Sequence, residues 1–171
     1  MFVLGIDPGL SRCGYGAVLK IPGGFKVHSG GVLCTEVADP LPKRLFLLQS
    51  DMRSLLDDLR PDVVAVERVF FQTNVRTAMA TAMAAGIALA AAQEHDCEIA
   101  QYTSNEVKMA VVGYGAASKE QVQRMVAHLL ALESPPRPPD VADALALAVC
   151  HLSSSSLKQS MAAALLGGSK K

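Results

Sequence analysis

Residues 2–7 read FVLGID, and a Pro-Gly pair follows them at once. The apolar run predicts a buried strand that ends at Asp7, and the Pro-Gly pair predicts a turn directly after it. Residues 14–20 and 30–36 are also short and β-prone, with a Pro-Gly-Gly turn signal at 22–24 between them. Three early strands with short connections predict an antiparallel meander whose first strand carries an acid at its end.

The period of the apolar residues changes to that of a helix between residues 41 and 60, and Pro61 ends this helix. Residues 62–67, DVVAVE, then predict a short buried strand that ends at Glu67. The remaining elements are expected in this order: an alanine-rich helix over 75–95, a strand over 97–102, a helix opened by a Thr103–Glu106 capping box, a second opened by Ser118 and Gln121 and running to about Leu132, and a final helix over 140–151.

The predicted order is therefore β-β-β-α-β-α-β-α-α-α, which belongs to the α/β class. Three antiparallel strands followed by strands with helical crossovers predict a mixed five-stranded sheet flanked by helices on both faces. The chain has 171 residues, of which 50% are hydrophobic, enough for one domain with a sizeable core. We expect this domain to cover residues 1–152. The serine-rich, small-residue stretch 153–171 is expected to be a flexible C-terminal tail.

The formal net charge is zero, which argues against a protein that binds nucleic acid through a general excess of positive charge. Any DNA-binding surface must then be a local basic patch. The four cysteines are widely spaced and form no C-x-x-C pair, which indicates reduced thiols and no zinc cluster. The apolar stretch 78–92 is mostly alanine and too weakly hydrophobic to span a membrane, and no signal peptide precedes the first strand. We therefore expect a cytoplasmic protein.

Four acids stand at the ends of predicted elements. Asp7 and Glu67 each end a strand, and Asp140 and Asp143 lie three residues apart on one face at the start of the last helix. If the two strands are neighbours, their ends present both acids at the same edge of the sheet. The simpler interpretations are that Asp7 is a solvated strand end and that both helical acids stabilise a helix N-terminus. Glu67 is harder to explain in this way, because it follows so apolar a run.

Clustered carboxylates repel one another unless a cation neutralises them. Oxygen ligands alone suit Mg²⁺ or Mn²⁺. Two such ions about 4 Å apart activate a water and stabilise the leaving oxygen of a phosphodiester. The four acids thus predict a divalent-metal-dependent nuclease.

Four longer blocks carry a family resemblance. They are GIDPGLSRCGYG (5–16), VVAVERVFFQTN (63–74), TSNEVKMAVVGYGAASKEQVQRMV (103–126) and PPDVADALALAVCH (138–151). In sequence and order they resemble the signature blocks of the RuvC family, the bacterial Holliday junction resolvases. The resemblance implies an RNase H-like fold and a homodimer. It also implies a Mg²⁺-dependent endonuclease that nicks two opposing strands of a four-way DNA junction, leaving 5′-phosphate and 3′-hydroxyl ends, and partnership with the branch-migration proteins RuvA and RuvB.

The resemblance also assigns roles to single residues. The family's metal-binding acids fall on the four acids above, which implies two ions bound alongside DNA. Phe70 matches an aromatic residue that stacks on an unpaired base; Phe71 competes for this role, and core packing is the alternative for Phe70. Lys108 and Lys119 match lysines near the scissile phosphate. The residues expected to contact the DNA backbone are Asn74, Arg76 and, with a salt-bridge role as its alternative, Arg68.

The helix from Thr77 to Ala92 is small or apolar nearly all round, more than one core face requires. This favours a face that packs against a second copy of the chain, although a helix enclosed within the monomer would show the same pattern. In this region the sequence TAMATAMAAG (77–86) departs from the Gly-Gln-Ala-Arg-Gly type of stretch found in many RuvC proteins. The departure concerns helix packing or the dimer face and leaves the four acids intact.

Three other functions fit parts of the sequence. The pattern D-x-G-x-x-x-x-G that starts at Asp7 also resembles the phosphate-binding turn of actin-like ATPases and sugar kinases, but those enzymes need two such domains and a longer chain. The YqgF-type nucleases share the first strand and its acid but lack the VFFQTN and DVADAL blocks. A non-catalytic junction-binding protein would keep the fold, and the intact four acids and two lysines argue against it.

Overall fold

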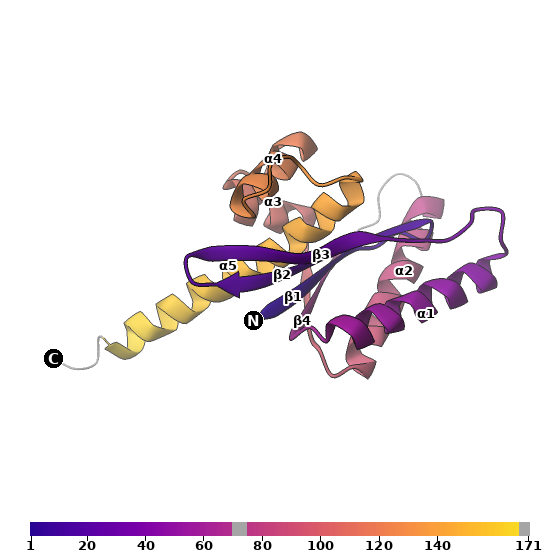
Figure 1. Cartoon of the computed structure of the whole chain (residues 1–171), viewed down its shortest axis with the longest axis horizontal. Coiled ribbons are helices and arrows are strands. Elements are labelled where there is room, and N and C mark those ends of the chain that lie inside the picture. Colours follow the sequence, from indigo (N-terminus) through magenta and orange to yellow (C-terminus); the bar gives the residue numbers. More distant parts are fainter. Residues whose placement is uncertain (70–74, 168–171) are drawn as a thin grey trace.

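The computed structural model describes residues 1–69 and 75–167, with the side chains of residue 76 and of residues 156–167 left out (Figure 1). The five strands are β1 (Phe2–Asp7), β2 (Arg12–Ile21), β3 (Gly24–Cys34), β4 (Val63–Glu67) and β5 (Glu98–Tyr102). The five helices are α1 (Leu41–Leu59), α2 (Val75–Glu94), α3 (Ser104–Val112), α4 (Lys119–Leu129) and α5 (Pro139–Gly167).

The strands form one mixed sheet in the order β3-β2-β1-β4-β5. β1, β2 and β3 pair in antiparallel fashion, while β4 joins β1 and β5 joins β4 in parallel. The predicted order of elements, the antiparallel meander and the five-stranded mixed sheet are all confirmed. The neighbouring positions of β1 and β4, on which the convergence of Asp7 and Glu67 depends, are confirmed as well.

Helices cover both faces of the sheet, and the two cores separate by the alternation of residues along each strand. On β1, Leu4 and Ile6 belong to the core under α1 and α2. Val3 on the same strand belongs to the core under α3, α4 and α5, together with Val63 and Ala65 of β4. Figure 1 shows α1 and α2 side by side, away from α3 and α4. Asp7 is in alternation with Val3 on β1, and Glu67 is in alternation with Val63 and Ala65 on β4. Both strand-end acids therefore lie on the α3–α5 side of the sheet.

α5 packs closely on the backbone of β1 and β2, and this contact depends on glycine. A Cβ atom at Gly5 would meet the carbonyl oxygen of Ala144 on α5. No other residue type leaves room for a helix backbone at this distance from the strand. The start of α5 is therefore held over the ends of β1 and β2, beside Asp7.

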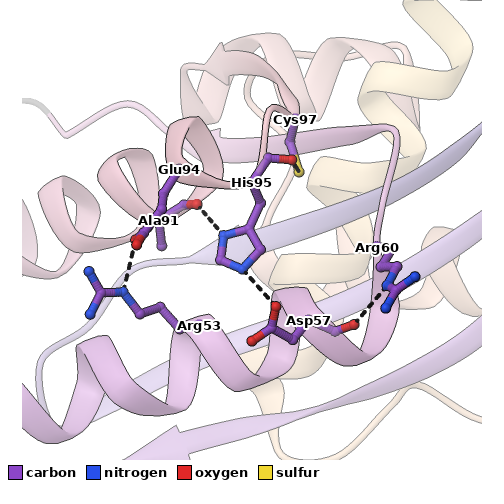
Figure 2. Close-up of polar contacts among 7 residues, drawn as sticks. All are labelled: Arg53, Asp57, Arg60, Ala91, Glu94, His95 and Cys97. Carbon is purple, nitrogen blue, oxygen red and sulfur yellow. Dashed lines mark hydrogen bonds and ion pairs between the residues drawn. The ribbon is translucent and has the colours of Figure 1, made fainter.

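α1 and α2 are tied together on the other face of the sheet by polar contacts (Figure 2). Arg53 donates to Glu94 at 2.8 Å. The Nδ1 atom of His95 lies 2.7 Å from the carbonyl oxygen of Ala91, and its Nε2 atom lies 3.2 Å from Asp57 Oδ1. Both ring nitrogens thus face acceptor oxygens, so only the protonated imidazole donates to both. This cluster joins the C-terminal halves of the two helices.

The largest difference from the sequence-based expectation is the length of the last helix. α5 was expected to end near His151, and this is wrong, because the helix continues to Gly167. Residues 161–166, MAAALL, are strong helix formers that outweigh the serines before them. α4 ends at Leu129, slightly before the expected Leu132. Within the described residues, no helix is long and apolar enough to cross a membrane.

Candidate active site

The ends of β1 and β4 bring two acids to one edge of the sheet. The two strands pair in parallel with Ile6 beside Val66, so the next residue of each strand, Asp7 and Glu67, follows at the same level. Both carboxylates line a single cavity of about 360 Å³ on the α3–α5 side of the sheet. The predicted convergence of the two strand-end acids is therefore found in the structure.

The start of α5 brings the other two acids to the same place. Gly14 on β2 lies opposite Asp7, and a Cβ atom at Gly14 would meet the carbonyl oxygen of Asp140. This close approach fixes the first turn of α5 against the end of the sheet. Asp143, one turn further along the helix, lines the cavity together with Asp7 and Glu67. Asp140 is not among the residues that line it and lies toward β2.

Two lysines from two different helices complete the cavity. Lys108 projects from α3, and Lys119 is the first residue of α4, directly after the Ser118 N-cap. Both helices begin with a capping box, as the sequence predicted, and these caps fix where each helix starts. Ser104 adds a hydroxyl to the wall, and apolar side chains supply the rest of the surface: Val107, Val122, Ala146 and Leu147.

Each of the two acids on α5 is paired with a cation. Lys119 Nζ lies 2.5 Å from Asp143 Oδ2. Arg12, the first residue of β2, donates to Asp140 Oδ2 from Nη2 at 2.9 Å and from Nε at 3.2 Å. The carboxylates at the two strand ends have the less favourable surroundings, because they are more deeply buried and face other acids.

Burial and charge repulsion disturb the ionisation of these acids. Burial, followed by the charges of Asp143 and Glu67, raises the pKa of Asp7 to about 7. Burial, followed by the charge of Asp143, also raises the pKa of Glu67. Burial opposes ionisation of Asp140 too, but the hydrogen bonds from Arg12 prevail and lower its pKa. A cluster of acids with raised pKa values is typical of a site that a cation completes.

The donor set fits a hard divalent cation, since it offers carboxylate oxygens and neither thiolate nor imidazole. In the described part of the chain, no three His, Cys, Asp or Glu side chains already stand in an arrangement that would hold a metal ion. The two ion pairs on α5 account for this, because Asp143 and Asp140 turn toward Lys119 and Arg12. Asp7, Glu67 and Asp143 are the residues of the cavity that could hold such a cation, and Lys119 is paired with Asp143 in this structure.

The residues expected to contact DNA are only partly accounted for. Arg68 follows Glu67 and is exposed, its backbone N–H donating to the carbonyl oxygen of Tyr102 at 2.7 Å. Phe70, Phe71 and Asn74 lie outside the described residues. Arg76 lies in the first turn of α2, and its side chain is not described.

Sequence reasoning missed Arg12 as a neighbour of the acids. The signal was present, because Arg12, Gly14 and Gly16 alternate on one face of β2, and a glycine series on a strand indicates that a helix packs closely there. An arginine in that series must lie at the start of the same helix. Ser104 was missed as well; as the first residue of a capped helix it carried no signal apart from its position.

Comparison with known proteins shows the family of the chain. A family model described as "Crossover junction endodeoxyribonuclease RuvC" matches residues 3–151. The protein of that name from Salinispora arenicola is 49% identical over 165 residues, covering 96% of this chain and 94% of the relative.

Solved structures match the fold of this chain. The Thermus thermophilus RuvC structure superposes with a TM-score of 0.85 at 35% identity, covering 92% of this chain and 97% of that one. The structure of T. thermophilus RuvC in complex with Holliday junction substrate gives a TM-score of 0.83 at 32% identity, covering 92% and 96%. With its fold and most of its length shared in this way, the chain belongs to the RuvC family of crossover junction endodeoxyribonucleases.

Proposed function

We propose that this protein resolves Holliday junctions in recombination and repair by cutting two opposing strands symmetrically. Each cut hydrolyses one phosphodiester bond and leaves a 5′-phosphate and a 3′-hydroxyl end. The observation that carries this proposal is the cavity in which Asp7, Glu67 and Asp143 meet Lys108 and Lys119. Carboxylates that hold a divalent cation, next to lysines that face a phosphate, form the arrangement that phosphodiester hydrolysis requires.

Mg²⁺ is the proposed metal, with Mn²⁺ as a substitute and two ions bound per site alongside DNA. When bound, the metal supplies an activated water and neutralises charge on the leaving oxygen. Asp7, which feels the charge of all three other acids, is the proposed shared ligand. Glu67 and Asp143, which line the same cavity, would be its further ligands. Asp140, at the edge of the cavity, orients the attacking water or accepts its proton.

Lys108 and Lys119 are proposed to face the scissile phosphate. Lys119 is held by Asp143 in this structure, and a cation on Asp143 would free its ammonium group to offset negative charge as the phosphorus becomes five-coordinate. Lys108 lines the cavity from α3. Arg68, Asn74, Arg76 and one of Phe70 and Phe71 are proposed to hold the DNA beyond the cut site, a role that rests on the family resemblance.

The protein is proposed to act as a homodimer, because two symmetric cuts require two active sites. An exposed apolar surface on α1 and α2 supports this. Met79 of α2 is 51% exposed and Phe46 of α1 is 67% exposed. Ala82, Gly86 and Ala90 recur on the exposed side of α2 at intervals of four residues, where small side chains allow another helix to approach closely.

Introducing a charged side chain into this apolar surface tests whether the surface forms the dimer interface. A Cβ atom at Gly86 meets nothing within 4 Å, so Gly86→Arg adds a charge without a clash inside the monomer. We expect this variant to sediment as a monomer at micromolar concentration, whereas Gln101→Arg on β5 stays dimeric. A monomeric wild-type protein would contradict the dimer.

Partnership with RuvA and RuvB, which the family resemblance implies, and a cytoplasmic location complete the proposal. Pull-down of RuvB–RuvA–junction complexes by the wild-type protein tests the partnership.

The central test is to incubate the protein with a synthetic four-way junction, and with duplex DNA of matching sequence, with and without Mg²⁺. We expect paired nicks at symmetric positions in the junction, none in the duplex, and none without the metal. Asp7→Asn should abolish nicking while junction binding persists, because the amide removes the negative charge of the shared ligand. Cleavage retained by Asp7→Asn would contradict the assignment of the metal site.

A further inference from the structure

Arg12 stands where it can set the position of the fourth acid. It is the first residue of β2 and follows the turn that begins after Asp7. Arg12, Gly14 and Gly16 occupy alternate positions and therefore share one face of the strand. Cβ atoms at Gly14 and Gly16 would meet Asp140 and Leu145, so this face lies directly under the start of α5. Arg12 carries the long side chain of this series, and this side chain reaches Asp140 in the first turn of α5.

The contact between Arg12 and Asp140 has a defined geometry. Nε and Nη2 both donate to the same carboxylate oxygen, Oδ2, at 3.2 and 2.9 Å. Two donors from one planar group restrict the rotation of the carboxylate more than a single contact does. Because the guanidinium contacts only Oδ2, the other oxygen of Asp140 is not occupied by Arg12.

The contact also determines where Asp140 lies relative to the other acids. Asp7, Glu67 and Asp143 line the cavity, whereas Asp140 stands outside that set, toward β2. An acid in the first turn of a helix can turn back toward its own backbone N–H groups, which attract negative charge. Asp140 keeps an interaction with its own backbone N–H, and the two donors of Arg12 in addition hold the carboxylate on the side of the sheet. The side chain of Asp140 is 25% exposed and that of Arg12 is 50% exposed, so the pair forms the rim of the site.

We propose that Arg12 is a positioning residue for hydrolysis, which fixes the carboxylate of Asp140 at the rim of the cavity with Oδ1 directed toward the reacting water. This inference rests on the proposed function, since it assigns Arg12 to the same reaction. Arg12 acts through Asp140 and requires no contact of its own with DNA or metal. Hydrogen-bonding partners of metal-site carboxylates commonly have large effects on activity without being ligands themselves.

The test compares Arg12→Gln and Arg12→Lys with a matched control. Arg53→Gln serves as the control, because Arg53 is also a half-exposed arginine paired with a carboxylate at 2.8 Å, but on the other face of the sheet (Figure 2). Three quantities are measured for each protein: the nicking rate at saturating Mg²⁺, the affinity for the junction without metal, and the binding of Mn²⁺ alone followed by electron paramagnetic resonance. Thermal unfolding of each variant is recorded alongside.

We expect Arg12→Gln to lower the nicking rate at saturating metal by about 10- to 100-fold. Junction affinity should stay within about twofold, and Mn²⁺ binding should not weaken, because removing a guanidinium takes a positive charge away from the cation. Arg12→Lys should recover part of the rate, since an ammonium group keeps the charge but not the paired donors. Arg53→Gln should match the wild-type protein.

Three outcomes would overturn the inference. A nicking rate of Arg12→Gln within twofold of the wild-type rate means that Asp140 needs no such support. A loss of rate that follows a loss of junction affinity means that Arg12 contacts DNA. A parallel loss of thermal stability and Mn²⁺ binding in both Arg12 variants means that its role is structural. If the wild-type protein itself nicks no junction with any divalent metal, the proposed function fails, which is distinct from a failure at Arg12.

Discussion

The carbonyl oxygen of Asp140 lies where a side chain at Gly14 would begin. Since Gly14 is paired with Asp7 across β1 and β2, this one contact joins three parts of the site: the first strand, its neighbour and the last helix. The register of β1 and β4 places Asp7 and Glu67 side by side. The absence of a side chain at Gly14 lets the start of α5, with Asp140 and Asp143, approach them. The geometry of the acidic cluster is thus a consequence of backbone packing.

Gly14→Ala should push the start of α5 away from the sheet. We expect a loss of stability of about 1–3 kcal/mol, the usual effect of an added methyl group in a filled space. Nicking should fall by more than stability alone explains, because the two acids of α5 move away from Asp7. Thermal unfolding and junction nicking measured together check this. Gly24→Ala is the control, because a Cβ atom there meets nothing within 4 Å; equal behaviour of the two variants would contradict the packing argument.

The sequence predicted the order of elements and the class of the fold because apolar periodicity, turn residues and capping boxes are local signals. Asp7 and Glu67 could be found in this way, since each ends a run that is too apolar to be anything but a strand. The sequence analysis had to assume that β1 and β4 are neighbours, because local sequence patterns do not determine the order of strands in a sheet. The structure supplies it through the parallel register of Ile6 and Val66.

The interactions between side chains could not be predicted from local pattern. Nothing in the sequence near Lys119 indicates that its ammonium group binds Asp143, 24 positions later. For Arg12, the glycine series on β2 indicates a closely packed helix but does not identify Asp140 as the partner. The extent of α5 was also missed, because four serines in succession read as a linker although the residues after them favour a helix. Long-range pairing and helix propagation both depend on the folded context.

Asp7→Asn should stabilise the metal-free protein at pH 8. The pKa of Asp7 is raised from 3.8 to about 7, chiefly by burial. Well below pH 3.8 the carboxyl is protonated in both the folded and the unfolded chain, so its ionisation has no effect on stability. As the pH rises toward 7, the unfolded chain ionises first, and the folded state loses stability. The asparagine variant avoids this loss and should be roughly 2–4 kcal/mol more stable at pH 8, since each pKa unit corresponds to about 1.4 kcal/mol.

Denaturation by urea at pH 4 and pH 8, without metal, measures this difference. We expect the two proteins to converge at pH 4, with Asp58→Asn on the exposed side of α1 following the wild-type protein throughout. Addition of Mg²⁺ at pH 8 should reverse the order, because the wild-type protein gains a bound cation and the variant does not. A variant that is less stable than the wild-type protein at pH 8 without metal would contradict the repulsion among the acids.

Metal binding should strengthen as the pH rises from 6 to 8. A cation must displace the proton from Asp7, and with a pKa of about 7 this carboxyl is mostly protonated at pH 6 and mostly ionised at pH 8. Because one proton is released for each ion bound, we expect Mn²⁺ affinity to be about tenfold weaker at pH 6 than at pH 8. Titration of Mn²⁺ into the wild-type protein at both pH values measures the ratio. An affinity that is the same at pH 6 and pH 8 would exclude Asp7 as a ligand.

Lys119→Met should separate metal binding from catalysis. Lys119 Nζ lies 2.5 Å from Asp143 Oδ2. Partial burial lowers the pKa of Lys119, but the hydrogen bond and charge of Asp143, together with the charges of Asp7 and Asp140, outweigh burial and raise it. Without the ammonium group, Asp143 is left among other acids, so the metal-free protein should lose stability. A cation no longer has to compete for Asp143, so Mn²⁺ should bind more tightly, while nicking falls by about 10²-fold or more because the phosphorane loses its positive neighbour.

Lys108→Met provides the contrast, because Lys108 lines the same cavity from α3 without an ion pair to an acid among the described contacts. We expect it to lower the nicking rate while leaving metal-free stability and Mn²⁺ affinity close to the wild-type values. The comparison needs calorimetric unfolding, Mn²⁺ titration and single-turnover nicking on all three proteins. Weaker Mn²⁺ binding by Lys119→Met would mean that the lysine organises Asp143 for the metal instead of competing with it. The role proposed for Lys119 at the phosphate would then have to be assigned to Lys108 alone.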